Sequence, residues 1–210
     1  DFDVKFDWFY LDYRVTDWLG FRAGRVKVPF GLYNDIQDID AARTAVLLPQ
    51  SIYQTTSRDF LLAQTGAELY GYVELRSAGA LDYRIYGGTV FVEVTDAPGN
   101  PYEITELNID HIVGARLMYE APLDGLRFGG SVQFLDFDGD LLFDQAVWEP
   151  MQMMGDLPSD FDGFVHFELP ALLSLGSIEY AAHDLLLALE YGRWHVDLTS
   201  TQPTLFPSVE

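Results

Sequence analysis

The chain has 210 residues and a formal net charge of -21, and 49% of its residues are hydrophobic. This charge argues against nucleic acid as a partner, because phosphate contacts need Lys and Arg side chains. The absence of cysteine excludes disulfides and thiolate metal sites, and no apolar run approaches the roughly 18 residues of a membrane-spanning helix.

Eight segments alternate apolar and polar side chains with the period of a β-strand. In the first, the apolar positions shift by one residue near Phe9, which predicts a β-bulge. In the seventh, Pro170 interrupts the alternation, so we expect its membrane-spanning part to begin at Ala171. The eight predicted strands cover residues 2–15, 19–30, 66–75, 81–94, 109–120, 126–135, 164–181 and 185–198.

The connections between these strands alternate between short and long. The short ones are residues 16–18, 76–80, 121–125 and 182–184, and the long ones are residues 31–65, 95–108 and 136–162. A transmembrane β-barrel has this asymmetry, because one rim carries tight turns and the other carries long loops. Only helices and closed barrels satisfy every backbone group in lipid.

We therefore predict an all-β fold, namely an antiparallel transmembrane β-barrel of which about eight strands are present as part of a larger barrel. Residues 1–210 would form a single barrel domain that is incomplete at its C-terminal end and also at its N-terminal end. A soluble β-sandwich shows the same alternation, so the period alone leaves that alternative open.

The most specific motif is the segment 21–34, which reads Phe-Arg-Ala-Gly-Arg-Val-Lys-Val-Pro-Phe-Gly-Leu-Tyr-Asn. It resembles Gram-negative outer-membrane porins, in particular the phosphate-selective porin O and P family and related general porins. The segment 177–193 resembles a later hairpin of the same proteins. The resemblance implies a barrel in the bacterial outer membrane, a water-filled pore and a homo-trimer.

Basic residues inside the strand patterns are the candidate pore-lining residues. Arg25 and Lys27 share a parity, and a cation facing the bilayer midplane costs about 2 to 4 kcal/mol, so we expect both to face the lumen. Gly24, Val26 and Val28 would then face lipid. The remaining candidates in strands are Arg84, Arg116, Arg127, Glu68 and Glu74. Charged rings in a lumen set ion selectivity, whereas pairing with lumenal carboxylates would stabilise the wall, and both interpretations remain open.

The segment 31–65 is too long for a simple connector. Asp40 is placed to cap a short helix over residues 41–48 that Pro49 ends. We expect this loop to fold into the barrel and constrict the pore, with Arg43 and Arg58 as further pore-lining residues. The alternative is an external loop that contacts a neighbouring subunit.

Other chemical signals are weak. The segment 136–140, Asp-Phe-Asp-Gly-Asp, begins like a calcium loop, but it lacks Gly at the sixth position and Glu at the twelfth. We interpret residues 136–162 as a solvated acidic loop. The four histidines have no metal-ligand spacing, and there is no nucleophile elbow. We expect no enzyme activity, no catalytic residue, no metal and no cofactor.

The sequence therefore predicts an outer-membrane porin for the passive diffusion of small polar or anionic solutes and ions. Its expected partners are outer-membrane lipid, lipopolysaccharide and those solutes. Two alternatives remain: a non-conducting outer-membrane barrel for adhesion or assembly, and a soluble β-sandwich that binds carbohydrate.

Overall fold

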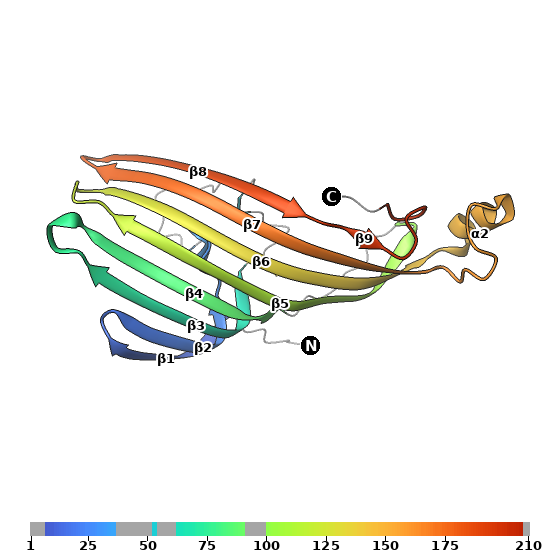
Figure 1. The fold of residues 1–210 in the computed structure, drawn as a ribbon, viewed down its shortest axis with the longest axis horizontal. Helices are drawn as coiled ribbons and strands as arrows, with labels where there is room; N and C mark the ends of the chain where they lie inside the picture. The colour runs from blue at the N-terminus through green and yellow to red at the C-terminus, as the bar shows by residue number, and fades with distance from the viewer. Residues whose placement is uncertain (1–6, 37–51, 54–61, 91–99, 208–210) are drawn as a thin grey trace, which may run out of the picture.

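The computed structural model describes residues 7–36, 52–53, 62–90 and 100–207, and its main feature is one long antiparallel sheet (Figure 1). Eight strands lie in chain order, each paired with the next, and a ninth short strand pairs with β7. The strands are β1 (Phe9–Thr16), β2 (Leu19–Lys27), β3 (Ala63–Glu74), β4 (Ala80–Val90), β5 (Tyr102–Glu120), β6 (Leu126–Phe143), β7 (Phe164–Ala182), β8 (Leu185–Val196) and β9 (Thr199–Ser200).

The all-β antiparallel prediction is confirmed, but the sheet is not closed into a barrel. Within the described residues, β1 and β8 are the two edges of the meander and do not pair with each other. The predicted bulge near Phe9 is wrong, because β1 pairs with β2 without a shift from Phe9 to Arg14. The register shift lies between Arg14 and Thr16.

The four short connections lie together at one end of the sheet (Figure 1). His183 and Asp184 both have positive φ, at 53° and 60°, and they form a two-residue turn between β7 and β8. Such a turn twists in the sense that the two flanking strands require. β2, β4 and β6 run from these short turns towards the opposite end of the sheet (Figure 1).

Two strands, β5 and β6, are much longer than predicted, and together with the first part of β7 they form an extension beyond the rest of the sheet. The segment 136–143 continues β6 and pairs with residues 102–111 of β5 and with residues 164–170 of β7. The prediction of a loop from residue 136 is therefore wrong. Helix α2 (Gln145–Met154) follows β6. Side chains of this helix pack against a separate hydrophobic core that includes Leu141, Phe161 and Phe167.

Pro170 lies inside β7 without interrupting it. Its carbonyl oxygen accepts a hydrogen bond from the Asp197 backbone N–H at 3.1 Å, so this residue's polar groups face the β8 side of the strand. The β8 pairing ends at Ala171, and β9 pairs only with residues 167 and 168. The position where Pro170 lacks an N–H therefore faces the gap between β8 and β9, so no hydrogen bond between strands is lost there.

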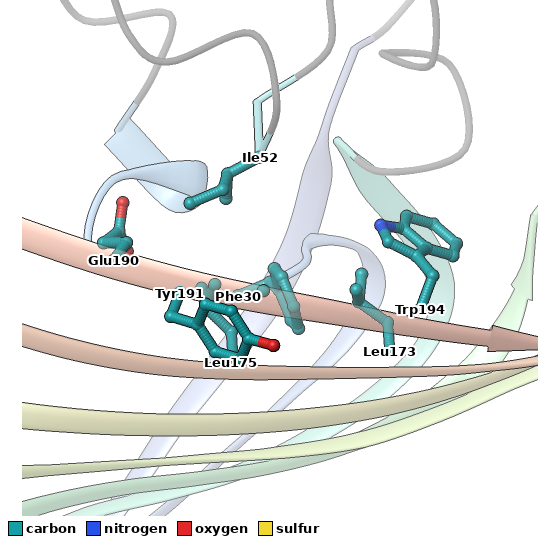
Figure 2. Close-up of a pocket in the computed structure, with 8 residues that line it drawn as sticks. Phe30, Ile52, Leu173, Leu175, Glu190, Tyr191 and Trp194 are labelled. Carbon is teal, nitrogen blue, oxygen red and sulfur yellow. The ribbon is translucent and has the colours of Figure 1, made fainter.

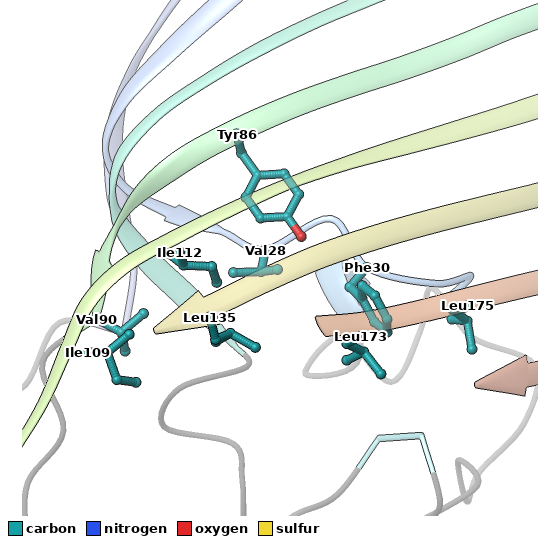
Figure 3. Packing of buried hydrophobic residues seen from close by; sticks show 9 residues of the cluster. All are labelled: Val28, Phe30, Tyr86, Val90, Ile109, Ile112, Leu135, Leu173 and Leu175. Atoms are coloured by element: carbon teal, nitrogen blue, oxygen red, sulfur yellow. The ribbon is translucent and has the colours of Figure 1, made fainter. Parts of the chain in front are cut away.

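The segment after β2 lies against one face of the sheet, which we call the inner face. Val28 and Phe30 are buried there against Ile112, Leu135 and Leu173, from three different strands (Figure 3). We call residues 28–36 the inner segment; it includes the short 3-10 helix η1 (Asn34–Ile36). Among the described residues, no helix combines the length and the apolar character that crossing a membrane requires.

Candidate functional site

Polar side chains on neighbouring strands form cross-strand rows on the inner face. Arg22 of β2 pairs with Glu68 of β3, which pairs with Tyr86 of β4. In an adjacent row, Arg84 of β4 pairs with Arg116 of β5. Because directly paired residues of an antiparallel ladder place their side chains on the same face, these groups converge.

Three arginines and four carboxylates form one ion-pair network on this face. Arg22 contacts Asp12 at 2.8 Å and Glu68 at 3.2 Å. Each of the other two arginines contacts Asp35 and Asp82, and Arg84 also reaches Glu68. The distances are 3.2 and 3.7 Å for Arg84 to Asp35 and Asp82, 3.5 and 3.4 Å for Arg116 to Asp35 and Asp82, and 3.8 Å for Arg84 to Glu68.

The network is close to electrically balanced. The Glu68 side chain is fully buried, and a buried carboxylate is tolerated only when cations compensate it. Each arginine has at least two carboxylate neighbours. Among the described residues, the arginines of the inner face are therefore paired with carboxylates and do not form a row of free cations.

Asp35 differs from the other carboxylates because it belongs to the inner segment and not to the wall. Nearby, the Arg116 guanidinium donates to the Gly31 carbonyl at 3.4 Å, and the Gly31 N–H donates to the Ser131 hydroxyl at 3.1 Å. Gly31 has φ of 64°, and an added Cβ would lie 2.6 Å from the Tyr53 hydroxyl. The network thus fixes the start of the inner segment onto β4, β5 and β6.

A second set of contacts ties the inner segment to β7 and β8. The Tyr33 hydroxyl donates to Glu179 at 2.6 Å, and Arg127 donates to the other oxygen of this carboxylate at 2.8 Å. The Tyr53 hydroxyl donates to Glu190 and accepts from the backbone N–H of Tyr33. Burial and the adjacent carboxylates raise the pKa of both tyrosines, so the hydroxyls remain protonated donors.

The outer face of the sheet is apolar and uncovered by any other described segment. Leu69, Ile85, Val113 and Leu117 point outward from β3, β4 and β5, and each is about half exposed. The same apolar face extends to the edge strands β1 and β8. Its other large exposed side chains are Phe9, Leu11, Tyr13, Val15, Phe21, Phe128, Val132, Phe134, Leu172, Ile178, Leu185, Leu187, Leu189 and Tyr191.

The outward face changes from apolar to acidic at one level of the sheet. On β6, Phe134 is followed at the same parity by Asp136, Asp138 and Asp140. These pair with residues of β5 and β7 that include Glu106 and Glu168 in neighbouring rows. The apolar outer face is thus bounded by the short turns at one end and by acidic side chains at the other.

The structure brings together four of the predicted site residues in strands: Glu68, Arg84 and Arg116 in the network, and Arg127 beside Glu179. Arg25 pairs with Phe9 and Thr65, and its Nε donates to the Asp7 carbonyl at 2.8 Å. The Lys27 ammonium lies 5.1 Å from the centre of the Trp8 ring. Glu74 is the last residue of β3. Arg43 and Arg58, with the predicted helix 41–48, lie outside the described residues.

Two expectations about this region change. Arg25, which we expected to face the lumen, lies in a row with Phe9 and Thr65 on the face of β2 opposite to the inner-face residue Arg22. Val26 and Val28, which we expected to face lipid, are buried, because the chain after β2 folds over them. Sequence reasoning also missed Arg22, Asp35 and Tyr33. A parity signal was present for Arg22: it lies three residues from Arg25, so the two side chains point to opposite faces of one strand. The contacts of Asp35 and Tyr33 leave no local signal.

No family model matches the chain, and neither does any curated protein or solved structure.

Proposed function

We propose that the chain forms part of the wall of an outer-membrane β-barrel that acts as a porin for small polar or anionic solutes. The observation that carries this proposal is the inverted polarity of the sheet. Large apolar side chains are exposed on the outer face, and the ion pairs lie on the inner face. Transmembrane barrels distribute polarity in this way, with lipid outside and water inside.

The level at which the outer face turns acidic supports the same interpretation. On β6, outward apolar positions run from Leu126 to Phe134, which is about 26 Å along the strand at the usual rise per residue. A tilted strand needs about 9 to 11 residues to cross the bilayer, and residues 126–134 supply nine. The carboxylates that begin at Asp136 would then lie at the headgroups, and the extension would stand outside the membrane.

The inner segment is the candidate constriction. It crosses the inner face from β2 towards Glu179 of β7 and Glu190 of β8, so it would narrow a lumen enclosed by this wall. Because the three arginines of the network are paired with carboxylates, we expect a modest charge preference. We expect a lumen with paired charges to pass small polar solutes and not to select strictly for anions. The pore-constricting role of residues 31–65 remains a prediction.

A plugged, non-conducting barrel for adhesion or assembly is the second candidate. It is favoured by the same inner segment, because Val28 and Phe30 form a packed core on the inner face. A soluble sandwich is less well supported, because its apolar face would pack against a second layer, and none of the described segments covers the outer face.

Conductance in a planar bilayer under a salt gradient tests the proposal. We expect stepwise conductance from folded, heat-modifiable protein. Arg84→Gln should move the reversal potential towards cation preference, whereas the control Arg76→Gln, in the short turn η4 (Arg76–Ala78), should leave it unchanged. Folded protein without conductance would favour the plugged barrel. Protein that stays soluble and folded without detergent would contradict both membrane interpretations.

A further inference from the structure

A cavity of about 200 Å³ opens between β7, β8 and the inner segment. Glu190 and Trp194 lie at opposite ends of it along β8, with Phe30 and Leu173 between them in the view of Figure 2. Gly192 lies between these two residues on the same face of the strand. Since Gly192 has no side chain, the space between the carboxylate and the indole ring stays open.

The lining of this cavity is mainly apolar. Phe30, Ile52, Leu173 and Leu175 contribute hydrocarbon surface, and Trp194 adds an aromatic ring. Among the described residues that line the cavity, Glu190 is the only ionisable side chain apart from the phenol of Tyr191. Binding sites for small molecules commonly combine an apolar lining with a few convergent polar groups.

The Glu190 carboxylate is held in place by neutral donors. One oxygen accepts from the Leu32 backbone N–H and the Ser177 hydroxyl at 3.0 Å, and both oxygens lie within 2.8 Å of the Tyr53 hydroxyl. Among the described residues, no basic side chain lies within ion-pair distance of it. By contrast, Glu179 has Arg127 at 2.8 Å. Within the described part of the chain, Glu190 therefore presents a negative charge that no basic side chain compensates.

We propose that this cavity binds a small organic cation with an apolar body, in the class of aryl-alkylamines. The ammonium group would pair with the free acceptor positions of Glu190, because ion-paired hydrogen bonds are stronger than neutral ones. The hydrocarbon part would lie over Phe30 and Leu173, and an aromatic or cationic group can stack on Trp194. An anion would be repelled by Glu190, and none of the described lining residues is a base that could offset this repulsion.

This proposal goes beyond passage of small polar or anionic solutes, and it does not depend on conductance. The binding experiment uses the full chain folded in detergent micelles, with the fluorescence of Trp194 as the signal and Trp194→Phe as the blank. Three probes share one ring: 2-phenylethylamine, 2-phenylethanol and phenylacetate. They differ in charge, so the comparison isolates the contribution of Glu190.

Two variants and one control separate binding from folding. Glu190→Gln removes the charge but also alters contacts with Tyr53. Gly192→Val fills the cavity and keeps every hydrogen bond of Glu190; its Cβ would lie 3.3 Å from a flexible methyl group of Leu175. Gly176→Val is the matched control, because a Cβ there meets nothing within 4 Å and the residue lies on the outer face.

We expect the amine to bind about tenfold more tightly than the alcohol, which is the ratio that one charge-assisted hydrogen bond supplies. Glu190→Gln should abolish this preference, Gly192→Val should weaken amine binding at least as much, and Gly176→Val should match the parent chain. Equal affinity for amine and alcohol, tighter binding of phenylacetate, or undiminished amine binding by Gly192→Val would each overturn the proposal. Loss of conductance with intact amine binding would contradict the porin function alone.

Discussion

The hydroxyl of Tyr33 lies 2.6 Å from the Glu179 carboxylate, although 146 residues separate the two in the chain. This hydrogen bond joins the inner segment to β7 and is buried. Arg127 holds the other carboxylate oxygen, so the acceptor is fixed whether or not Tyr33 is present. The position of the inner segment therefore depends on a donor that can be removed with little disturbance of the wall.

Replacing this donor should loosen the inner segment. Tyr33→Phe removes a hydrogen bond to a charged acceptor, and we expect the free energy of unfolding to fall by about 1.5 to 3 kcal/mol. Urea unfolding in detergent, followed by tryptophan fluorescence, measures the change. Tyr13→Phe is the matched control, because Tyr13 is exposed on the outer face. Equal stability of the two variants would show that the contact contributes nothing.

The charge of Asp35 should set the balance of the ion-pair network. Asp35→Asn removes the carboxylate that Arg84 and Arg116 share, so two guanidinium groups lose a negative neighbour. We expect the reversal potential of the channel to move towards anion preference, opposite to the effect of Arg84→Gln. Asp124→Asn changes the same charge in a short turn and serves as the control. An identical reversal potential in both variants would remove Asp35 from the conduction path.

Arg22 and Arg25 should differ sharply in their effect on stability. Arg22→Gln leaves the fully buried Glu68 with only Arg84 at 3.8 Å as a described ion-pair partner, and we expect a loss of about 2 to 4 kcal/mol. Arg25 donates to the Asp7 backbone carbonyl, and exposed surface contacts contribute little, so Arg25→Gln should cost about 0.5 kcal/mol or less. Urea unfolding of the two variants side by side measures the difference, and a reversed order would contradict the assignment.

The strand pattern predicted most of the sheet, since outward positions on β6 carry Leu126, Phe128, Val132 and Phe134, with Gly130 between them. It failed at Asp136, Asp138 and Asp140, which keep the same parity. Charges at alternate positions were interpreted as a loop because a strand facing lipid does not carry them. The structure continues the strand there, where the extension leaves the apolar level and outward carboxylates carry no desolvation cost.

The site was less predictable than the sheet. Glu68, Arg84 and Arg116 were found because they occupy polar positions of the apolar–polar alternation within single strands. Asp35 and Tyr33 were missed because their partners come from strands far away in the sequence, and no local period encodes such contacts. Val26 and Val28 misled the parity assignment, because an apolar side chain under a folded segment looks the same in sequence as one facing lipid.

Protonation of His166 should stabilise the extension. A hydrogen bond to Asp140 at 2.7 Å raises the pKa of His166 above the unfolded value of 6.5. The protonated histidine thus contributes stability that is fully present below pH 6.5 and is lost as the pH rises through the raised pKa. The parent chain should exceed His166→Asn in thermal stability at pH 5.5, and the difference should shrink by pH 8.5. A difference that grows with pH would contradict this linkage.

Contact between the outer face and lipid gives the sharpest test of the membrane assignment. Val132 is 44% exposed at the apolar level of β6, and Leu142 is 41% exposed on the same strand and parity but within the extension. An arginine facing the bilayer midplane costs about 2 to 4 kcal/mol, whereas one beyond the headgroups costs almost nothing. We therefore expect Val132→Arg to reduce folding into lipid vesicles and Leu142→Arg to fold like the parent chain. The folded fraction is measured by the heat-modifiable shift in electrophoresis. Equal folding of the two variants would mean that the apolar outer face contacts something other than lipid.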